Sequence, residues 1–414
     1  MLLSSFMQAS TLKLWYVGWT NEMKAVAQNI IDSQFTAKTG IKVDIEVFSW
    51  SDYYNKYLLS LASRDTPDLF TLGTETVDFG LRGGLVDLAK FKPTEFAQME
   101  KQVFGSLMGP FSFRNTRFGM PVSIGAMVAA YRLDILRDMG MEIPSEWEDI
   151  KKWQPKALAK QHTFGLHYGS VQYDSHWGAY TLITQNGGQF FNPDGFSSAL
   201  DKPGSIKGFQ EYISLFKDHK LPQAGVGIPT FVAGEWVMMT DGIWLYPNLL
   251  KNAPQLKGKW VLDLMPGTKQ ADGSIHHGSF AGSTVIGISS HSKNKEDAWQ
   301  FMKWFTSTEA QASIANGIIE RIPGSLWLPA NKNALNKVNI DPDTRKAYYG
   351  QLEHSEPAPY AANVAVLYRY VKFAVDKSIL NNMDPKTAIL EAAKEMNDEM
   401  SRRKKEYSRL LERL

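Results

Sequence analysis

A tryptophan that follows a predicted buried strand is the residue of this sequence with the clearest chemical use. Residues 231–246 are FVAGEWVMMTDGIWLY, in which an apolar run ends at Asp241-Gly242. Asp and Gly commonly end strands, so the pattern predicts Trp244 at the mouth of the strand. An indole offers a rigid apolar face and one N–H donor, which suits the C–H faces and hydroxyl edges of a pyranose. The alternative is a core tryptophan that caps the strand end, and the local pattern alone favours it.

Three N-terminal loops offer further aromatic or carboxylate side chains. Apolar patterns predict strands over 12–17, 41–47 and 68–72 with helices from Asn21 and Ser51 between them, and Trp19, Trp50 and Glu75 follow the three strands in turn. This βαβαβ order implies parallel strands, whose carboxyl ends lie at one edge of a sheet, where ligands bind. We therefore expect the three loops to meet. Trp50 is the weakest candidate, because an aromatic residue just before a helix often only packs against it.

The composition limits the possible functions. The 414 residues are enough for two domains, and 45 Lys+Arg against 43 Asp+Glu leave a net charge of +2, which argues against a nucleic-acid partner. Cysteine is absent, which suits an oxidising compartment and excludes thiolate chemistry. The segment 1–10 has no basic leader, so we see no signal segment.

The remainder of the chain predicts a second α/β block and no familiar catalytic motif. Strands are expected over 163–167 and 283–289, and helices over 177–185, behind Pro203, after Asn294 and after Asp384-Pro385, the last with a basic end at 402–405. Phosphate-binding loops and the GxSxG motif are absent. The adjacent His276 and His277 would point to opposite sides of a strand, which makes them poor joint metal ligands.

The order of the segments resembles the extracellular solute-binding proteins of ABC importers, in the sugar-binding group that includes maltose-binding protein. The most specific segments are GEWVMMTDGIW at 234–244 and SKNKEDAWQFMKW at 292–304, after an opening LKLWYVGWTNE at 12–22. Departures are Tyr131-Arg132 where the family usually has Tyr-Asn, Ile243 where it has Pro, and the lack of a lipid-anchor cysteine.

The resemblance implies an α/β fold of the type II, periplasmic-binding-protein-like kind, with two lobes joined by crossing strands and a ligand cleft between them. The first lobe would hold residues 11–118 plus 270–320, and the second 119–269 plus 321–414. Ligand contacts from both lobes would stabilise a closed form, which the importer permease reads. The resemblance also implies a monomer in an extracytoplasmic location, with no cofactor, no metal and no catalytic residue.

The resemblance assigns expected places to the site residues. Trp19 and Glu75 would come from the first lobe, Trp177 and Trp244 from the second, and Ser123 would lie at the floor. Phe280 and Gly282 would line the wall. Arg321, in the loop GIIERIPGS, would hold a hydroxyl pair or a substrate acid, with an ordinary surface ion pair as the alternative.

We expect non-catalytic capture of a carbohydrate, specifically an oligosaccharide, because aromatic rings are spread over four or more loops. A glycoside-active enzyme is the main rival, and it would need two carboxyl groups that flank one bond. A binder of a polyamine, a peptide or a phosphate ester is a third hypothesis. A polyamine site would need several facing acids among the rings, whereas the strand-end loops offer mainly Glu75.

Overall fold

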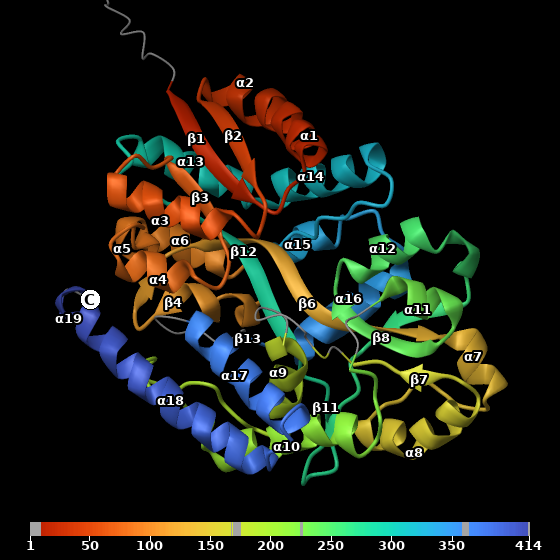
Figure 1. Cartoon of the computed structure of the whole chain (residues 1–414). Helices are drawn as coiled ribbons and strands as arrows, with labels where there is room; N and C mark the ends of the chain where they lie inside the picture. Colours follow the sequence, from red (N-terminus) through yellow and green to blue (C-terminus); the bar gives the residue numbers. More distant parts are fainter. Residues whose placement is uncertain (1–9, 167, 169–174, 224–226, 358–363, 413–414) are drawn as a thin grey trace, which may run out of the picture. The chain divides into compact units, whose positions relative to one another are not determined.

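The chain folds into two compact α/β units, each built from separated segments. The computed structural model describes residues 10–166, 168, 175–223, 227–357 and 364–412 (Figure 1). The first unit consists of the chain up to Ile124 and Ser283–Asn339, and the second of Gly125–Gly282 and Ile340–Glu412. Two of the crossings occur inside strands, β6 (Met120–Arg132) and β12 (Phe280–Ile288).

The first unit contains the predicted parallel sheet. Its strand order is β2-β1-β3-β12, with β1 at Thr11–Val17, β2 at Lys42–Phe48 and β3 at Leu69–Leu72. Leu14 of β1 pairs with Ile45 on one side and Leu69 on the other, both in parallel, and β12 joins β3 antiparallel. The predicted βαβαβ order is therefore confirmed, because these strands are parallel and helices connect them along the chain.

Helices of the first unit form where the sequence predicts them. Thr20 caps α1, and the helical stretch ends at Gly40, whose positive φ of 75° suits glycine. Helices α1 and α14 lie alongside each other (Figure 1). The bounds are α1 Asn21–Ile31, a π-helical turn Asp32–Thr36, α2 Ala37–Thr39, α3 Tyr53–Ser63, α4 Thr76–Leu81, α6 Pro93–Glu100, α13 Lys295–Phe305, α14 Thr308–Arg321 and α15 Lys332–Leu335.

The second unit is built on the other end of β6. Strands β8 (Trp236–Gly242) and β9 (Trp260–Asp263) both pair antiparallel with β6, and β7 (Thr163–Phe164) pairs parallel with β8. The start of β12 pairs with β13 (Glu356–Pro357). The strand predicted over 163–167 is thus shorter than expected, and His167 lies outside the described residues.

Helices of the second unit pack on these strands and on one another. Helix α9 contacts α10 and α17, and α17 contacts α18 (Figure 1). Asp384 caps α18 at Thr387, and Arg403, Lys404 and Lys405 of the basic run fall in its last turn, as predicted. Over the described part of the chain, the structure contains no helix with the length and apolar character needed to cross a membrane. The bounds are α8 Trp147–Ala159, α9 Ser175–Gln185, α10 Pro203–Lys217, α11 Ile228–Ala233, α12 Leu245–Asn252, α16 Pro342–His354, α17 Val364–Ile379 and α18 Pro385–Glu406.

The unit boundaries differ from the lobe boundaries expected from the sequence. Residues 119–124 and 321–339, expected in the second lobe, belong to the first unit, and residues 270–282, expected in the first lobe, belong to the second. Residues 321–339 join the first unit through contacts that the sequence pattern does not predict. Asn331 donates to Gln102 and to the Thr306 carbonyl, and Pro329 bridges to Ser123.

Candidate functional site

Three strand ends of the first unit converge on one cluster of side chains. We call Trp50, Tyr53 and Glu75, with Gly18 and Gly73 beneath them, the strand-end cluster. A Cβ added at Gly73 would lie 3.1 Å from both Trp50 and the Glu75 carboxylate and 3.4 Å from the Tyr53 hydroxyl. A Cβ at Gly18, whose φ is 89°, would lie 2.6 Å from Trp50 Nε1. The expectation that these loops meet at one sheet edge is confirmed for Trp50 and Glu75.

Two glycines at adjacent strand ends explain the position of Trp50. The indole crosses from the end of β1 to the end of β3 over backbone that carries no side chains. The Tyr53 ring supports it at 5.4 Å in a T-shaped contact. The ring nevertheless remains 52 % exposed, so it presents apolar surface to solvent. Trp50, the weakest candidate by sequence, is therefore the open ring of this cluster.

Glu75 is held in a defined but poorly solvated position. It precedes α4 directly and is half-buried, and the Tyr53 hydroxyl donates to its Oε2 at 2.5 Å. Burial raises the pKa of the Glu75 carboxyl, the Tyr53 hydrogen bond opposes that rise, and the negative charge of Asp78 adds to it. Glu75 therefore acts as an anchored acceptor beside the Trp50 ring.

Trp19 differs from its expected place at the rim. It is only 5 % exposed and stacks on Tyr16 with a centroid distance of 3.6 Å, while Phe305 and Trp327 meet it edge-on. All three neighbours belong to the first unit. Trp19 is therefore part of the core of this unit, where it supports the β1 end.

Two other predicted residues of the first unit lie in β6 and at the end of α14. Ser123 is buried in β6 beside Pro329. Arg321 is the last residue of α14, not a loop residue, and its side chain is exposed. In the part of the chain that the structure describes, no ion pair involves Arg321, so the surface ion pair considered as the alternative is not formed there.

The second unit gathers three predicted aromatic residues into one group. We call Trp177 of α9, Trp244 and Phe280 of β12 the ring cluster. Trp177 stacks on Phe280 at 5.5 Å with an interplanar angle of 18°, and meets Trp244 at 5.5 Å and 51°. Trp244 is 41 % exposed, and Trp177 is half-buried. The rings thus form a continuous apolar surface with an open end at Trp244.

Two glycines also leave room for the rings of this cluster. Gly242 ends β8, and a Cβ there would lie 2.2 Å from the Trp244 ring, so the indole folds back over the strand end. Trp244 also precedes α12, which fixes its backbone. The Phe280 ring covers Gly282, where an added Cβ would lie 2.9 Å from it. The prediction of a tryptophan at the mouth of this strand is confirmed.

Sequence analysis missed the tyrosines that support both clusters. Tyr180 contacts Phe280 edge-on at 5.6 Å, stacks on Phe190 at 4.8 Å, and donates to the carbonyl of Pro357. Its position three residues after Trp177 places both on one helix face, which is a usable signal. Tyr53 lies next to Tyr54, and no pattern distinguishes them.

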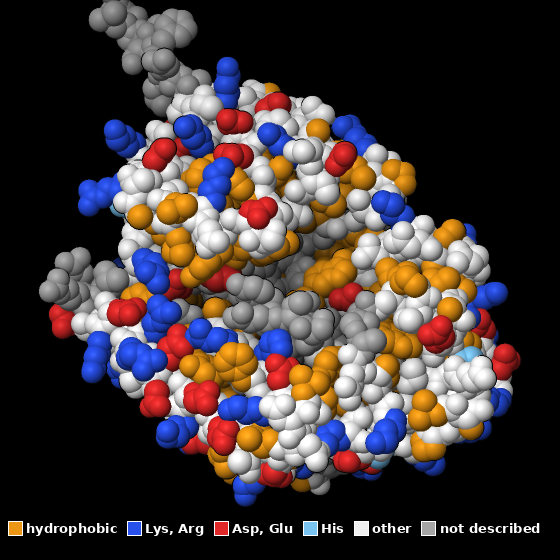
Figure 2. All heavy atoms as spheres, viewed as in Figure 1, with side chains coloured by type: hydrophobic (Ala, Val, Ile, Leu, Met, Phe, Trp, Pro, Cys, Tyr) orange, Lys and Arg blue, Asp and Glu red, His pale blue; other side chains and the backbone are white. Residues whose placement is uncertain are grey.

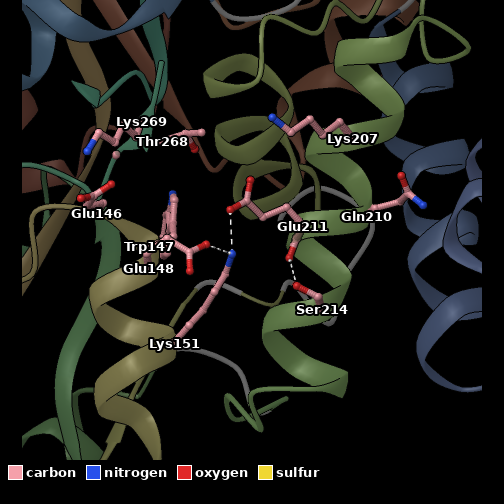
Figure 3. A pocket seen from close by; sticks show the side chains of 11 residues that line it. Glu146, Trp147, Glu148, Lys151, Lys207, Gln210, Glu211, Ser214, Thr268 and Lys269 are labelled. Carbon is pink, nitrogen blue, oxygen red and sulfur yellow. Dashed lines mark hydrogen bonds and ion pairs between the residues drawn. The ribbon is translucent and has the colours of Figure 1, made fainter. Parts of the chain in front are cut away.

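A separate cavity of about 480 Å³ lies in the second unit beside α8 and α10 (Figure 3). Lys151 projects into it and pairs with Glu148 at 2.6 Å and with Glu211 at 3.0 Å. Partial burial alone would lower the pKa of Lys151, but the two carboxylates raise it. None of the predicted site residues lines this cavity, and the Lys151 charge is already neutralised by protein groups.

The histidines do not make a metal centre in the described part of the chain. His277 Nδ1 lies 2.8 Å from the Met265 carbonyl, and His276 lies 3.9 Å from Glu356. His354 meets His277 at a ring distance of 5.5 Å. Within the described ranges, no group of His, Asp and Glu has an arrangement suited to a metal ion.

Comparisons with known proteins agree with this architecture. The sugar-binding protein MalE from Xanthomonas citri has a TM-score of 0.81 and 18% identity, covering 96% of this chain and 99% of that one. The likeness confirms the predicted two-lobe α/β fold. Among curated proteins, the maltotriose-binding protein of Pyrococcus abyssi is 22% identical over 92% of this chain and 79% of its own length. The diacetylchitobiose-binding protein DasA of Streptomyces coelicolor is 24% identical over 69% and 67%.

A sequence model of the family described as "Bacterial extracellular solute-binding protein" matches residues 18–312. The match includes the strand-end cluster and the ring cluster, as well as the GEWVMMTDGIW and SKNKEDAWQFMKW segments. The chain belongs to the family of bacterial extracellular solute-binding proteins.

Proposed function

We propose that this protein is the substrate-binding component of an ABC importer, and that it captures a carbohydrate, specifically an oligosaccharide, for delivery to the permease. The observation that carries the proposal is that each unit presents an open indole held over glycine, Trp50 in the first and Trp244 in the second. Such faces bind the C–H surfaces of sugar rings, and nearby polar groups select among hydroxyl patterns.

The relatives support a sugar over other solutes. The curated matches bind maltotriose and diacetylchitobiose by name, and both are built from more than one sugar unit. A ligand of this length would use several rings, which matches their spread over separate loops. The ligand would be enclosed by hinge closure, with contacts from both lobes that stabilise the closed form.

Capture without chemistry is part of the proposal. Retaining or inverting glycosidases need two carboxyl groups placed on either side of one bond. The ring cluster consists of aromatic side chains, and the strand-end cluster contributes Glu75 as its carboxylate. We also propose that the protein acts outside the cytoplasm as a monomer and does not bind nucleic acid. The interspersed acidic and basic side chains on the face in Figure 2 support the last point.

Calorimetric titration with maltotriose and with diacetylchitobiose, followed by mass analysis of the recovered sugar, tests this function. The proposal predicts saturable binding of at least one oligosaccharide and its recovery unchanged after prolonged incubation. Cleavage of the bound sugar would instead establish the glycoside-active rival.

A further inference from the structure

Glu75 is a half-buried carboxylate that the protein leaves without a cation. Its side-chain partner is the Tyr53 hydroxyl, which is neutral. Among the residues that the structure describes, no lysine or arginine forms an ion pair with it. A carboxylate in such a place loses solvation that the phenol and a backbone N–H do not fully restore, since burial still raises its pKa.

Two basic side chains on the elements around this cluster, one on α3 and one at the end of α4, are engaged elsewhere. Arg82 pairs with Asp78 at 3.0 Å, and Lys56 pairs with Glu46 at 2.8 Å while it lies over the Phe48 ring. Asp78 itself is buried and adds negative potential at Glu75. The local field at the strand-end cluster therefore favours a positive charge.

The Trp50 ring adds a second feature that attracts cations. The ring is 52 % exposed and lies beside the Glu75 carboxylate, because both groups approach the same point above Gly73. An indole face attracts an ammonium group through its quadrupole, and tryptophan is the best of the aromatic side chains at this. A sugar unit on Trp50 with an amino group toward Glu75 would satisfy both groups at once.

We propose that the strand-end cluster selects a sugar unit that carries an ammonium group, so that the protein prefers an amino sugar to the corresponding neutral sugar. This inference rests on the proposed function, since it specifies the chemical class of the captured carbohydrate. Hydrogen bonds to charged partners exceed neutral ones by about 1 kcal/mol or more, so we expect a preference of about tenfold.

Matched sugars test the inference directly. Oligomers of β-linked glucosamine and the cello-oligomers of the same length differ only in an amine or a hydroxyl at one ring position. Titration in slightly acidic buffer, where the amines are protonated, should give about tenfold tighter binding of the amino series. Glu75→Gln should remove this preference, so that the amino and neutral series bind the variant with equal affinity. Tyr53→Phe, which keeps the carboxyl group and removes only its phenol donor, should still prefer the amino series.

A charge-matched control separates the local effect from net charge. Asp44→Asn removes an exposed acid from β2 of the same unit, away from the strand-end cluster, and should leave the preference intact. Far-UV circular dichroism of each variant checks folding, and Tyr53→Phe keeps the test informative if Glu75→Gln is unstable.

The outcomes separate the inference from the proposed function. Binding of neutral oligosaccharides with no advantage for the amino series, or an advantage that survives in Glu75→Gln, overturns the inference and leaves the proposed function standing. Binding of spermidine with no binding of any sugar overturns both. Failure to bind any glucosamine oligomer counts against the inference as well.

Discussion

Replacement of Trp244 by alanine gives the sharpest quantitative prediction. The side chain is 41 % exposed, and a tryptophan offers on the order of 200 Å², so about 80 Å² is available for a sugar face. At about 25 cal/mol per Å², the loss of this contact costs about 2 kcal/mol, which corresponds to about a 30-fold weaker affinity. The rest of the ring packs on Trp177 and over Gly242, so some loss of stability accompanies the change.

Calorimetric titration of the wild-type protein and the variant with the same oligosaccharide measures this loss. Leu250→Ala is the matched control, because Leu250 lies on α12 close in sequence and is 46 % exposed, yet is outside the ring cluster. The control should bind as the wild type does. An affinity of Trp244→Ala within threefold of the wild type, or an equal loss in Leu250→Ala, would refute the assignment of Trp244 as a sugar platform.

Three further predictions concern the scaffold. Gly18→Ala should weaken ligand binding and lower the free energy of unfolding by about 1–2 kcal/mol, because the added Cβ would displace Trp50. Gly40 also has a positive φ, but no atom lies close to its added Cβ, so Gly40→Ala should lower stability without weakening binding. An equal loss of affinity in Gly40→Ala would contradict the role given to Gly18. Arg132→Met should cost about 3 kcal/mol in urea unfolding, because it removes two hydrogen bonds to Asp134 and one to the Phe231 carbonyl; a loss below 1 kcal/mol would count against it. Burial and two neighbouring histidines lower the pKa of His354, so its contribution to stability is complete above pH 6.5 and is lost as the pH falls through the lowered pKa. Thermal melts from pH 6.5 downward should show a melting temperature that depends less steeply on pH in His354→Gln. An unchanged pH dependence would disprove this prediction.

The fold of the first unit could be predicted because its signals are local. Strict alternation in 41–47 predicts a half-buried strand, and Gly40 and Thr20 mark helix ends by their own chemistry. Local sequence patterns do not predict the boundaries between the two units. Residues 321–339 join the first unit through contacts of Asn331 with Gln102 and Thr306, which are far apart in the sequence.

The site was predictable in part for the same reason. Trp244 follows directly from the strand that positions it. Trp50 depends on Gly18 and Gly73, which become neighbours only after three strands pair. Trp19 is buried by Phe305 and Trp327, which lie about three hundred residues away, so no local pattern could show that the ring is covered.

Thermal stabilisation across a ligand panel tests whether this protein captures a carbohydrate. The panel holds neutral mono- and oligosaccharides, amino sugars, sugar acids, polyamines and short peptides. A ligand that binds only the folded state stabilises it by about 2.7 kcal/mol at a concentration of a hundred times its Kd. This stabilisation raises the melting temperature. Carbohydrate capture predicts a selective rise with an oligosaccharide that is greatly reduced in Trp244→Ala. A rise with a polyamine or a peptide and with no sugar would contradict it.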